Sequence, residues 1–189
     1  VEGAERAGVA IGVLRLASDD ATRALWPHEF EAELTLVLGG LQLDIELAIT
    51  NTGSTAFDFT AALHGYLACD DVRRARLGGL YGTRYLDSVS GLEQRQEIDP
   101  FTFVGEIDRI YFDAQEPLTF ATAAGRTTIE QEGFCDVVVW NPGPAKAAAL
   151  ADLPDDDWLN FLCVEAATIG RPVLLTPGEQ WTGRQGFSV

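Results

Sequence analysis

EFEAELTLVL, residues 29–38, and LQLDIELAI, residues 41–49, show most clearly what kind of structure this chain forms. Charged or polar residues alternate with apolar ones along both segments, which is the period of two expected of a β-strand with one buried face. The dipeptide Gly39-Gly40 between them can adopt the positive φ angles of a two-residue hairpin turn. The sequence therefore predicts an antiparallel β-hairpin with its turn at Gly39-Gly40.

Similar strand patterns recur along most of the chain. They predict strands at residues 9–16, 56–69, 106–112, 118–122, 127–132, 134–140, 161–168 and 179–189. The one convincing helical stretch is AKAAALADL, residues 145–153, which begins after a Pro/Gly-rich turn and ends before Pro154. The predicted fold class is all-β: a large antiparallel sandwich with one short helix.

The composition restricts the kinds of partner. A chain of 189 residues that is 47% hydrophobic can form one or at most two globular domains with a real core. The formal net charge of -16 argues against nucleic acid and anionic membrane surfaces, because both require a basic protein surface. There is no run of 18 apolar residues, so no membrane-spanning segment is predicted.

The cysteines and histidines argue against disulfides and metals. Cys69, Cys135 and Cys163 are odd in number and lie in apolar, strand-like segments, so we expect buried free thiols and a reducing, cytoplasmic compartment. No signal sequence is visible. No pair of His or Cys residues has the close spacing of zinc ligands, and no Gly-rich phosphate loop follows a strand.

Three polar residues within strand-like segments are candidates for chemistry. His64, in FTAALHGYLACDD (residues 59–71), falls on the polar row of its strand. Glu165, in FLCVEAATI (residues 161–169), is a carboxylate in an apolar stretch, which is costly unless it is paired, solvated or functional. Asp108 precedes Arg109 in GEIDRIYF, residues 105–112. Acid–base catalysis needs a histidine and a carboxylate in one cleft, and a structural or solvent-facing role is the simpler reading of each residue alone.

Seven segments, in this order along the chain, resemble the hexose-6-phosphate mutarotases (glucose-6-phosphate 1-epimerases) of the aldose 1-epimerase superfamily. They are WPHEFEAELTLVL, NTGSTAFDFTAALHGYLACDD, GLYGTRYLD, EIDRIYF, DVVVWNPGPAKAAALADL, CVEAATI and PGEQWTGRQGFSV. The resemblance implies a galactose-mutarotase-like β-supersandwich that interconverts the anomers of an aldohexose, expected here to be a hexose 6-phosphate. It implies no metal and no cofactor, and we expect a monomer.

The resemblance also implies roles for the three polar residues. His64 matches the general acid of the family, Glu165 the general base, and Asp108 the ligand of a sugar hydroxyl. We therefore expect His64 and Glu165 to meet in one cleft with room for a pyranose ring between them. The chain departs from the family beside the acid, since Gly65 stands where threonine is usual and Leu67 where phenylalanine is usual. Both departures could alter the wall of the cleft.

The chain contains no methionine, and the resemblance covers the C-terminal two-thirds of the family domain. We therefore expect residues 1–189 to be a single, N-terminally incomplete domain with an unpaired sheet edge, lacking the arginines that hold phosphate in the family. The arginine cluster Arg73, Arg74 and Arg76 is a candidate substitute, although solvation at the surface is the simpler role. Two alternatives remain: a non-catalytic sugar-binding or regulatory domain, and a sandwich domain appended to a larger carbohydrate-active enzyme.

Overall fold

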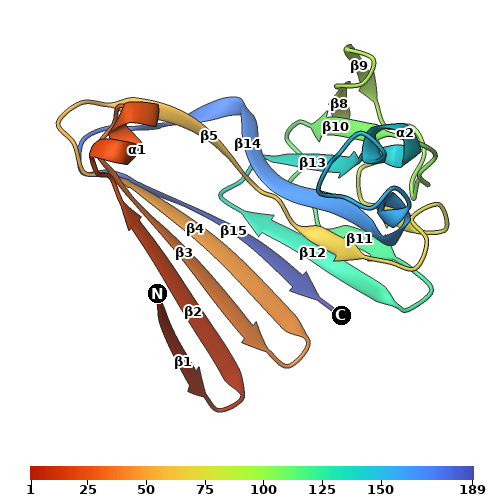
Figure 1. Cartoon of the computed structure of the whole chain (residues 1–189), viewed down its shortest axis with the longest axis horizontal. Helices are drawn as coiled ribbons and strands as arrows, with labels where there is room; N and C mark the ends of the chain where they lie inside the picture. Colours follow the sequence, from red (N-terminus) through yellow and green to blue (C-terminus); the bar gives the residue numbers. More distant parts are fainter.

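The computed structural model describes all 189 residues except the side chain of Arg6. Its strands form two antiparallel sheets (Figure 1). The strands are β1 (Glu2–Arg6), β2 (Val9–Ala17), β3 (Phe30–Gly39), β4 (Gln42–Asn51), β5 (Phe57–Leu63), β6 (Tyr66–Ala68), β7 (Arg76–Gly78), β8 (Arg84–Asp87), β9 (Leu92–Arg95), β10 (Ile107–Tyr111), β11 (Leu118–Ala121), β12 (Arg126–Glu132), β13 (Asp136–Asn141), β14 (Phe161–Leu175) and β15 (Gln180–Ser188). The helices are α1 (Asp20–Leu25), α2 (Gly143–Ala147) and the 3-10 helix η1 (Asp157–Asn160).

The order of strands places distant parts of the chain side by side. The eight-stranded sheet has the order β1-β2-β3-β4-β15-β12-β11-β7. The seven-stranded sheet has the order β5-β14-β13-β10-β8-β9, and β6 also pairs with β14. The predicted antiparallel β-fold is thereby confirmed, because every strand pair is antiparallel and the helices are few and short.

The predicted hairpin of β3 and β4 is present, with its turn one residue later than expected. Gly39 pairs with Gln42 as a strand residue, so Gly40 and Leu41 form the two-residue loop. Gly40 has a φ of 58°, which a glycine adopts without steric cost.

The main core lies between the seven-stranded sheet and the β7-β11-β12-β15 half of the other sheet. Alternation along the strands sends one set of apolar side chains into this space. The most deeply buried of them include Leu77, Leu118, Phe120, Tyr111, Val137, Val139, Leu162 and Val164. A second, smaller cluster of Phe30, Phe57 and Leu175 joins β3, β5 and β14.

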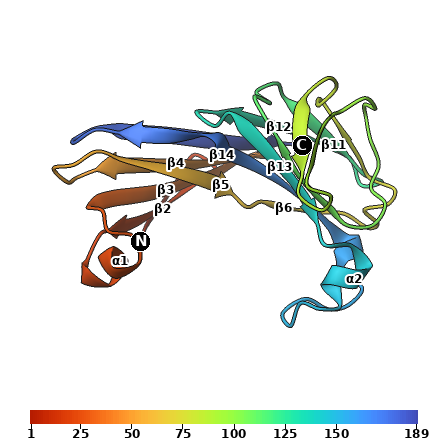
Figure 2. The same cartoon turned by 90° about the horizontal axis from the view of Figure 1, so that it is seen from above.

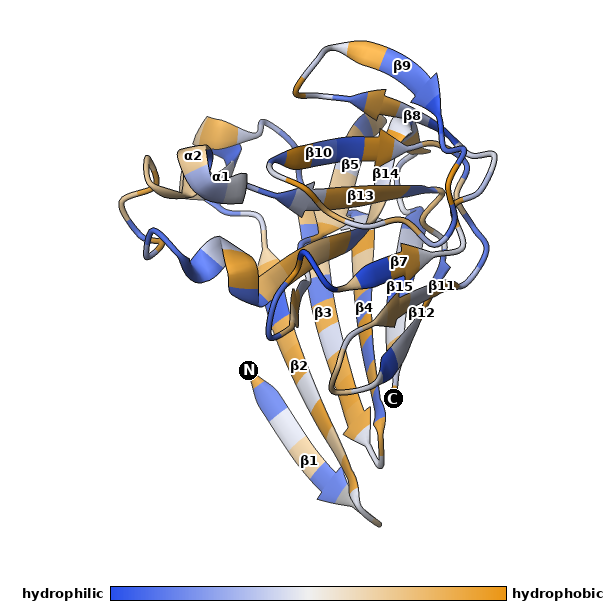
Figure 3. Ribbon diagram, turned by 90° about the vertical axis from the view of Figure 1, so that its right-hand side faces the viewer, coloured by the Kyte–Doolittle hydropathy of each residue, from blue (hydrophilic) through white to orange (hydrophobic). Residues whose placement is uncertain are grey.

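Strands β1 to β4 form an arm of the eight-stranded sheet that extends away from the seven-stranded sheet (Figure 1, Figure 2). Cross-strand pairing aligns Leu14, Leu34 and Leu47 on the face of the arm that continues the inner face of the sandwich. Apolar segments along β2, β3 and β4 are visible in Figure 3. Leu14, Leu16 and Leu38 on this face are exposed, so the apolar side of the arm is only partly covered. Strand β5 lies at the end of the seven-stranded sheet.

Two of the sequence-based expectations were wrong in detail. Residues 56–69 form two strands, β5 and β6, with a break at His64 and Gly65. The helix expected at residues 145–153 is the shorter α2, which begins at Gly143, where φ is 61°, and has Pro144 in its first turn. Helix α1 was not expected; Asp19 and Thr22 cap its N-terminus reciprocally.

Within the residues that the structure describes, no helix is both long and apolar enough to cross a membrane. The three cysteines are free, as predicted. Cys163 is fully buried in β14, whereas Cys69 and Cys135 are only partly buried and lie just outside strands, Cys69 after β6 and Cys135 before β13.

Candidate functional site

Glu165 lies in the middle of β14, where that strand is paired on both sides. Residues 161–168 are all buried, and β14 pairs here with β13 on one side and with β5 and β6 on the other. The carboxylate extends from the sheet face opposite the main core, opposite Val138 of β13, and the side chain is only 6% exposed. The ladder on both sides fixes the backbone that carries this carboxylate.

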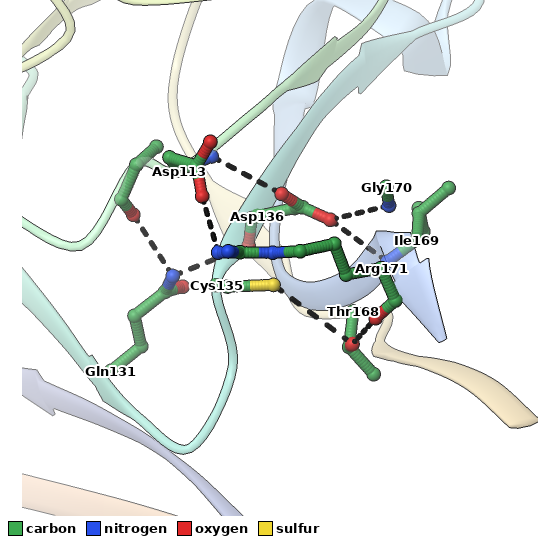
Figure 4. Close-up of polar contacts among 9 residues, drawn as sticks. Asp113, Gln131, Cys135, Asp136, Thr168, Ile169, Gly170 and Arg171 are labelled. Carbon is green, nitrogen blue, oxygen red and sulfur yellow. Dashed lines mark hydrogen bonds and ion pairs between the residues drawn. The ribbon is translucent and has the colours of Figure 1, made fainter. Parts of the chain in front are cut away.

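A polar cluster bends β14 just beyond this point (Figure 4). The buried carboxylate of Asp136 accepts hydrogen bonds from the backbone N–H groups of Ile169 and Gly170, at 2.8 and 2.7 Å, and from that of Asp113 at 3.2 Å. The Thr168 hydroxyl donates to the carbonyl of Arg171 at 2.9 Å. The bonds made by Ile169, Gly170 and Arg171 satisfy backbone groups at the register shift between Thr168 and Val173. Residues 161–168, which carry Glu165, therefore form a regular strand although β14 bends after them.

His64 lies at the break between β5 and β6, both of which pair with β14. Leu63 pairs with Ala166 and Tyr66 pairs with Cys163, so the intervening residues pass beside Glu165. The His64 Nε2 atom is 3.2 Å from the Glu165 Oε1 atom. The imidazole is 50% exposed whereas its partner is almost covered. The pair thus presents one accessible and one shielded ionisable group.

The direct contact corrects one expectation, namely that a pyranose ring would fit between His64 and Glu165. A separation of 3.2 Å leaves no such space. The chemistry explains why the groups can be adjacent: the ring oxygen and the anomeric hydroxyl oxygen of a hemiacetal are bonded to the same carbon. An acid and a base that act on these two oxygens can therefore lie side by side at one edge of the ring.

Asp108 lies on the same face of the same sheet, two strands away. In the ladder it pairs with Trp140 of β13, which in turn pairs with Cys163 of β14. Cys163 is two residues before Glu165, so these side chains share a face. The charges of the two carboxylates interact, as the ionisation of Glu165 shows. Burial raises the pKa of Glu165 to about 7, and the negative charge of Asp108 contributes to the rise.

The neighbouring Arg109 belongs to a different environment. Its side chain is on the core side of the sheet, where it contacts Asp87 at 3.3 Å and lies over the ring of Tyr85 at 4.6 Å. Arg73, from the arginine cluster noted in the sequence, makes two hydrogen bonds from its guanidinium to Asp71. Both arginines are therefore engaged in ion pairs with carboxylates.

Aromatic side chains that the sequence analysis did not single out surround the histidine. Tyr66 stacks on His64 with ring centroids 5.0 Å apart, and Trp140 meets His64 edge-on at 5.8 Å. Phe161 packs against both Tyr66 and Trp140. The signal available in the sequence was the alternation that puts Trp140 and Asp108 on outward positions of adjacent strands. Among the described residues, no three His, Cys, Asp or Glu side chains gather as a metal site requires.

The fold and the site together define a two-sheet antiparallel β-sandwich that carries a histidine–carboxylate pair on the outward face of one sheet. The family is shown by the match of residues 5–188 to the aldose 1-epimerase family model. The chain belongs to the aldose 1-epimerase family, whose reaction is an isomerisation.

The relatives agree with this assignment. A protein of Cenchrus ciliaris is 36% identical over 182 residues, which are 93% of this chain and 55% of the relative; its name, glucose-6-phosphate 1-epimerase, is provisional. An Escherichia coli K12 protein with the same provisional name is 31% identical over 164 residues, which are 85% of this chain and 53% of the relative. The chain therefore spans about half the length of the curated relatives that it matches.

Solved structures show the same fold. The crystal structure of YeaD from Salmonella typhimurium, described provisionally as a mutarotase, is 28% identical and superposes with a TM-score of 0.88 over 99% of this chain and 62% of that one. The Slr1438 protein from Synechocystis sp. PCC 6803 superposes with a TM-score of 0.80 at 20% identity, over 99% of this chain and 64% of its own. At this identity, the similarity to Slr1438 shows a shared fold alone.

Proposed function

We propose that this chain carries the acid–base site of an epimerase that interconverts the α and β anomers of an aldohexose, with a hexose 6-phosphate as substrate. The observation that carries the proposal is the 3.2 Å contact between His64 Nε2 and Glu165 Oε1 on an accessible sheet face. The provisional names of the two curated relatives support the phosphorylated substrate. The three free thiols support a reducing compartment, the cytoplasm.

The reaction removes a proton from one of the two oxygens bonded to the anomeric carbon and adds a proton to the other. Glu165 takes the proton of the anomeric hydroxyl while His64 gives a proton to the ring oxygen, and the hemiacetal opens to the aldehyde. Rotation about the bond between the first two carbons presents the other face of the aldehyde, and reclosure gives the second anomer. The roles of the acid and the base reverse on closure. Asp108 accepts a hydrogen bond from a sugar hydroxyl and orients the ring.

The ionisation of Glu165 suits this task. A carboxylate with a pKa near 7 is a stronger base than an exposed glutamate, and it still holds a useful ionised fraction at neutral pH. Its burial produces this shift, while the neighbouring His64 remains half exposed and can exchange protons with water. The asymmetry of burial within the pair therefore supports Glu165 as the base and His64 as the acid.

The test is an anomerisation assay on the full-length protein, with glucose 6-phosphate compared with free glucose and galactose. Glu165→Gln and His64→Asn should each lower turnover about 100-fold or more, the usual scale for loss of one general acid or base. Glu130→Gln, which removes an exposed carboxylate of β12, is the matched control. Near-normal turnover in either site variant would refute the assignment. Binding of the sugar without turnover by the wild-type protein would indicate the non-catalytic alternative.

A further inference from the structure

Trp140 occupies the part of the site between the acid–base pair and Asp108. The β-ladder pairs Cys163 with Trp140 and Trp140 with Asp108, two residue pairs along from the pairing of Val138 with Glu165. Cys163 is completely buried, whereas Trp140 is partly exposed. Trp140 is therefore a partly exposed residue beside Asp108, on the strand next to the one that carries Glu165.

The indole is held in place by other rings. It lies nearly parallel to Phe161, with an interplanar angle of 29° and centroids 6.0 Å apart, and its contact with His64 is edge-on at 71°. An aromatic ring fixed by neighbours loses little conformational freedom when a ligand binds. Such a ring offers a flat apolar surface beside charged groups. The C–H groups on one face of a pyranose present the complementary surface.

We propose that Trp140 is a specificity-determining residue that binds the C–H face of a pyranose ring while Asp108 binds a hydroxyl at its edge. The inference rests on the proposed function, since the ring is placed by its anomeric centre at Glu165 and His64. It identifies the ligand class as a closed, chair-shaped sugar ring, because an open-chain polyol has no flat face. Trp140 therefore contributes to binding of the ring and takes no part in proton transfer.

A binding measurement that needs no chemistry tests this role. The probe is 1,5-anhydroglucitol 6-phosphate, which has the pyranose ring but no anomeric hydroxyl, and glucitol 6-phosphate is its acyclic counterpart. In the full-length protein, the ring probe should quench tryptophan fluorescence and the acyclic probe should bind at least several-fold more weakly. Trp140→Leu should weaken binding of the ring probe by roughly tenfold and abolish the quenching, and Trp140→Phe should have a smaller effect.

Trp181→Phe is the matched control, because Trp181 lies in β15 of the other sheet and packs against Phe59 and Phe134. This variant should keep both the affinity and the quenching. In the anomerisation assay, Trp140→Leu should raise KM by about the same factor as the dissociation constant of the probe. Equal affinity of wild type and Trp140→Leu for the ring probe, or equal affinity of wild type for both probes, would overturn the proposal.

The outcome separates this inference from the proposed function. Trp140-dependent binding of the ring probe without anomerisation would uphold the aromatic platform and refute the epimerase. Anomerisation with an unchanged KM in Trp140→Leu would uphold the epimerase and refute the platform.

Discussion

Replacing Glu165 with glutamine should change how the stability of the fold depends on pH. Burial raises the pKa of this carboxyl group from 4.5 to about 7. As the pH rises from about 4.5, the unfolded chain loses this proton first, while the folded protein keeps it until the pH is near 7. The folded state therefore binds more protons in this interval. Its stability relative to the unfolded chain falls as the pH increases, and the loss is complete above pH 7.

The magnitude follows from the shift. Each pKa unit corresponds to about 1.4 kcal/mol, so a rise from 4.5 to about 7 lowers the free energy of unfolding by about 3 kcal/mol once the group is ionised. Glutamine has nearly the same shape and does not ionise. Glu165→Gln should therefore match the wild type near pH 4 and be more stable by about 3 kcal/mol near pH 8.

Urea unfolding of both proteins at several pH values measures the difference. Ionisable groups that do not interact with Glu165 contribute equally in the two proteins, so their contributions cancel. Glu130→Gln controls for the loss of one negative charge from a chain of net charge -16. A stability difference between Glu165→Gln and wild type that does not grow with pH would refute the raised pKa. It would show instead that the contact with His64 holds the carboxylate in its ionised form.

Two further substitutions test the support beneath the site. Gly65→Ser should be more stable than Gly65→Ala by about 1 kcal/mol in urea unfolding. The Oε1 atom of Gln185 is buried and unpaired and lies 3.8 Å from the position of a Cβ atom added at Gly65, so a serine hydroxyl there can donate a hydrogen bond to it. Equal stabilities of the two variants would contradict this. Asp136→Asn should lower the free energy of unfolding by about 2 kcal/mol and speed hydrogen exchange at the amides of Ile169 and Gly170, since it removes a charged acceptor from both. Unchanged exchange at these amides would show that the bend of β14 does not depend on that charge.

The strands that could be predicted from the sequence are those with a clear alternation or with turn residues at their ends. Strands β3 and β4 alternate between polar and apolar residues, and β3, β4, β12 and β15 all lie close to their predicted bounds. Strands β7, β8 and β9 contain only three or four residues, and β9 is exposed throughout, so they have no alternation to detect. Pairing with neighbours, rather than their own composition, makes them strands.

The break beside His64 could not be predicted, for a related reason. Exposed and less exposed residues alternate without interruption from Phe57 to Asp70, straight through His64 and Gly65. The polar row was therefore assigned correctly while the break was missed. The break exists only in the pairing, where Leu63 and Tyr66 bond to different parts of β14.

The meeting of His64 with Glu165 could not be derived from spacing. It depends on the register of β5 against β14, with Leu63 opposite Ala166, and the register of strands far apart in sequence is set by tertiary packing. The likeness of the surrounding segments to a known family supplied that information. Trp140 and Tyr66 were missed because an aromatic residue in a strand is most simply explained as core packing.

The acid, the base and the hydroxyl-binding carboxylate all extend from a single sheet, the one built around β14. Their mutual distances are therefore set by backbone ladders, which are stiff across neighbouring strands, and not by how the two sheets are docked. Sliding or breathing of one sheet against the other moves the three groups together as one body. The apolar face of the arm of β1 to β4 can therefore be covered or uncovered without altering the alignment of His64, Glu165 and Asp108.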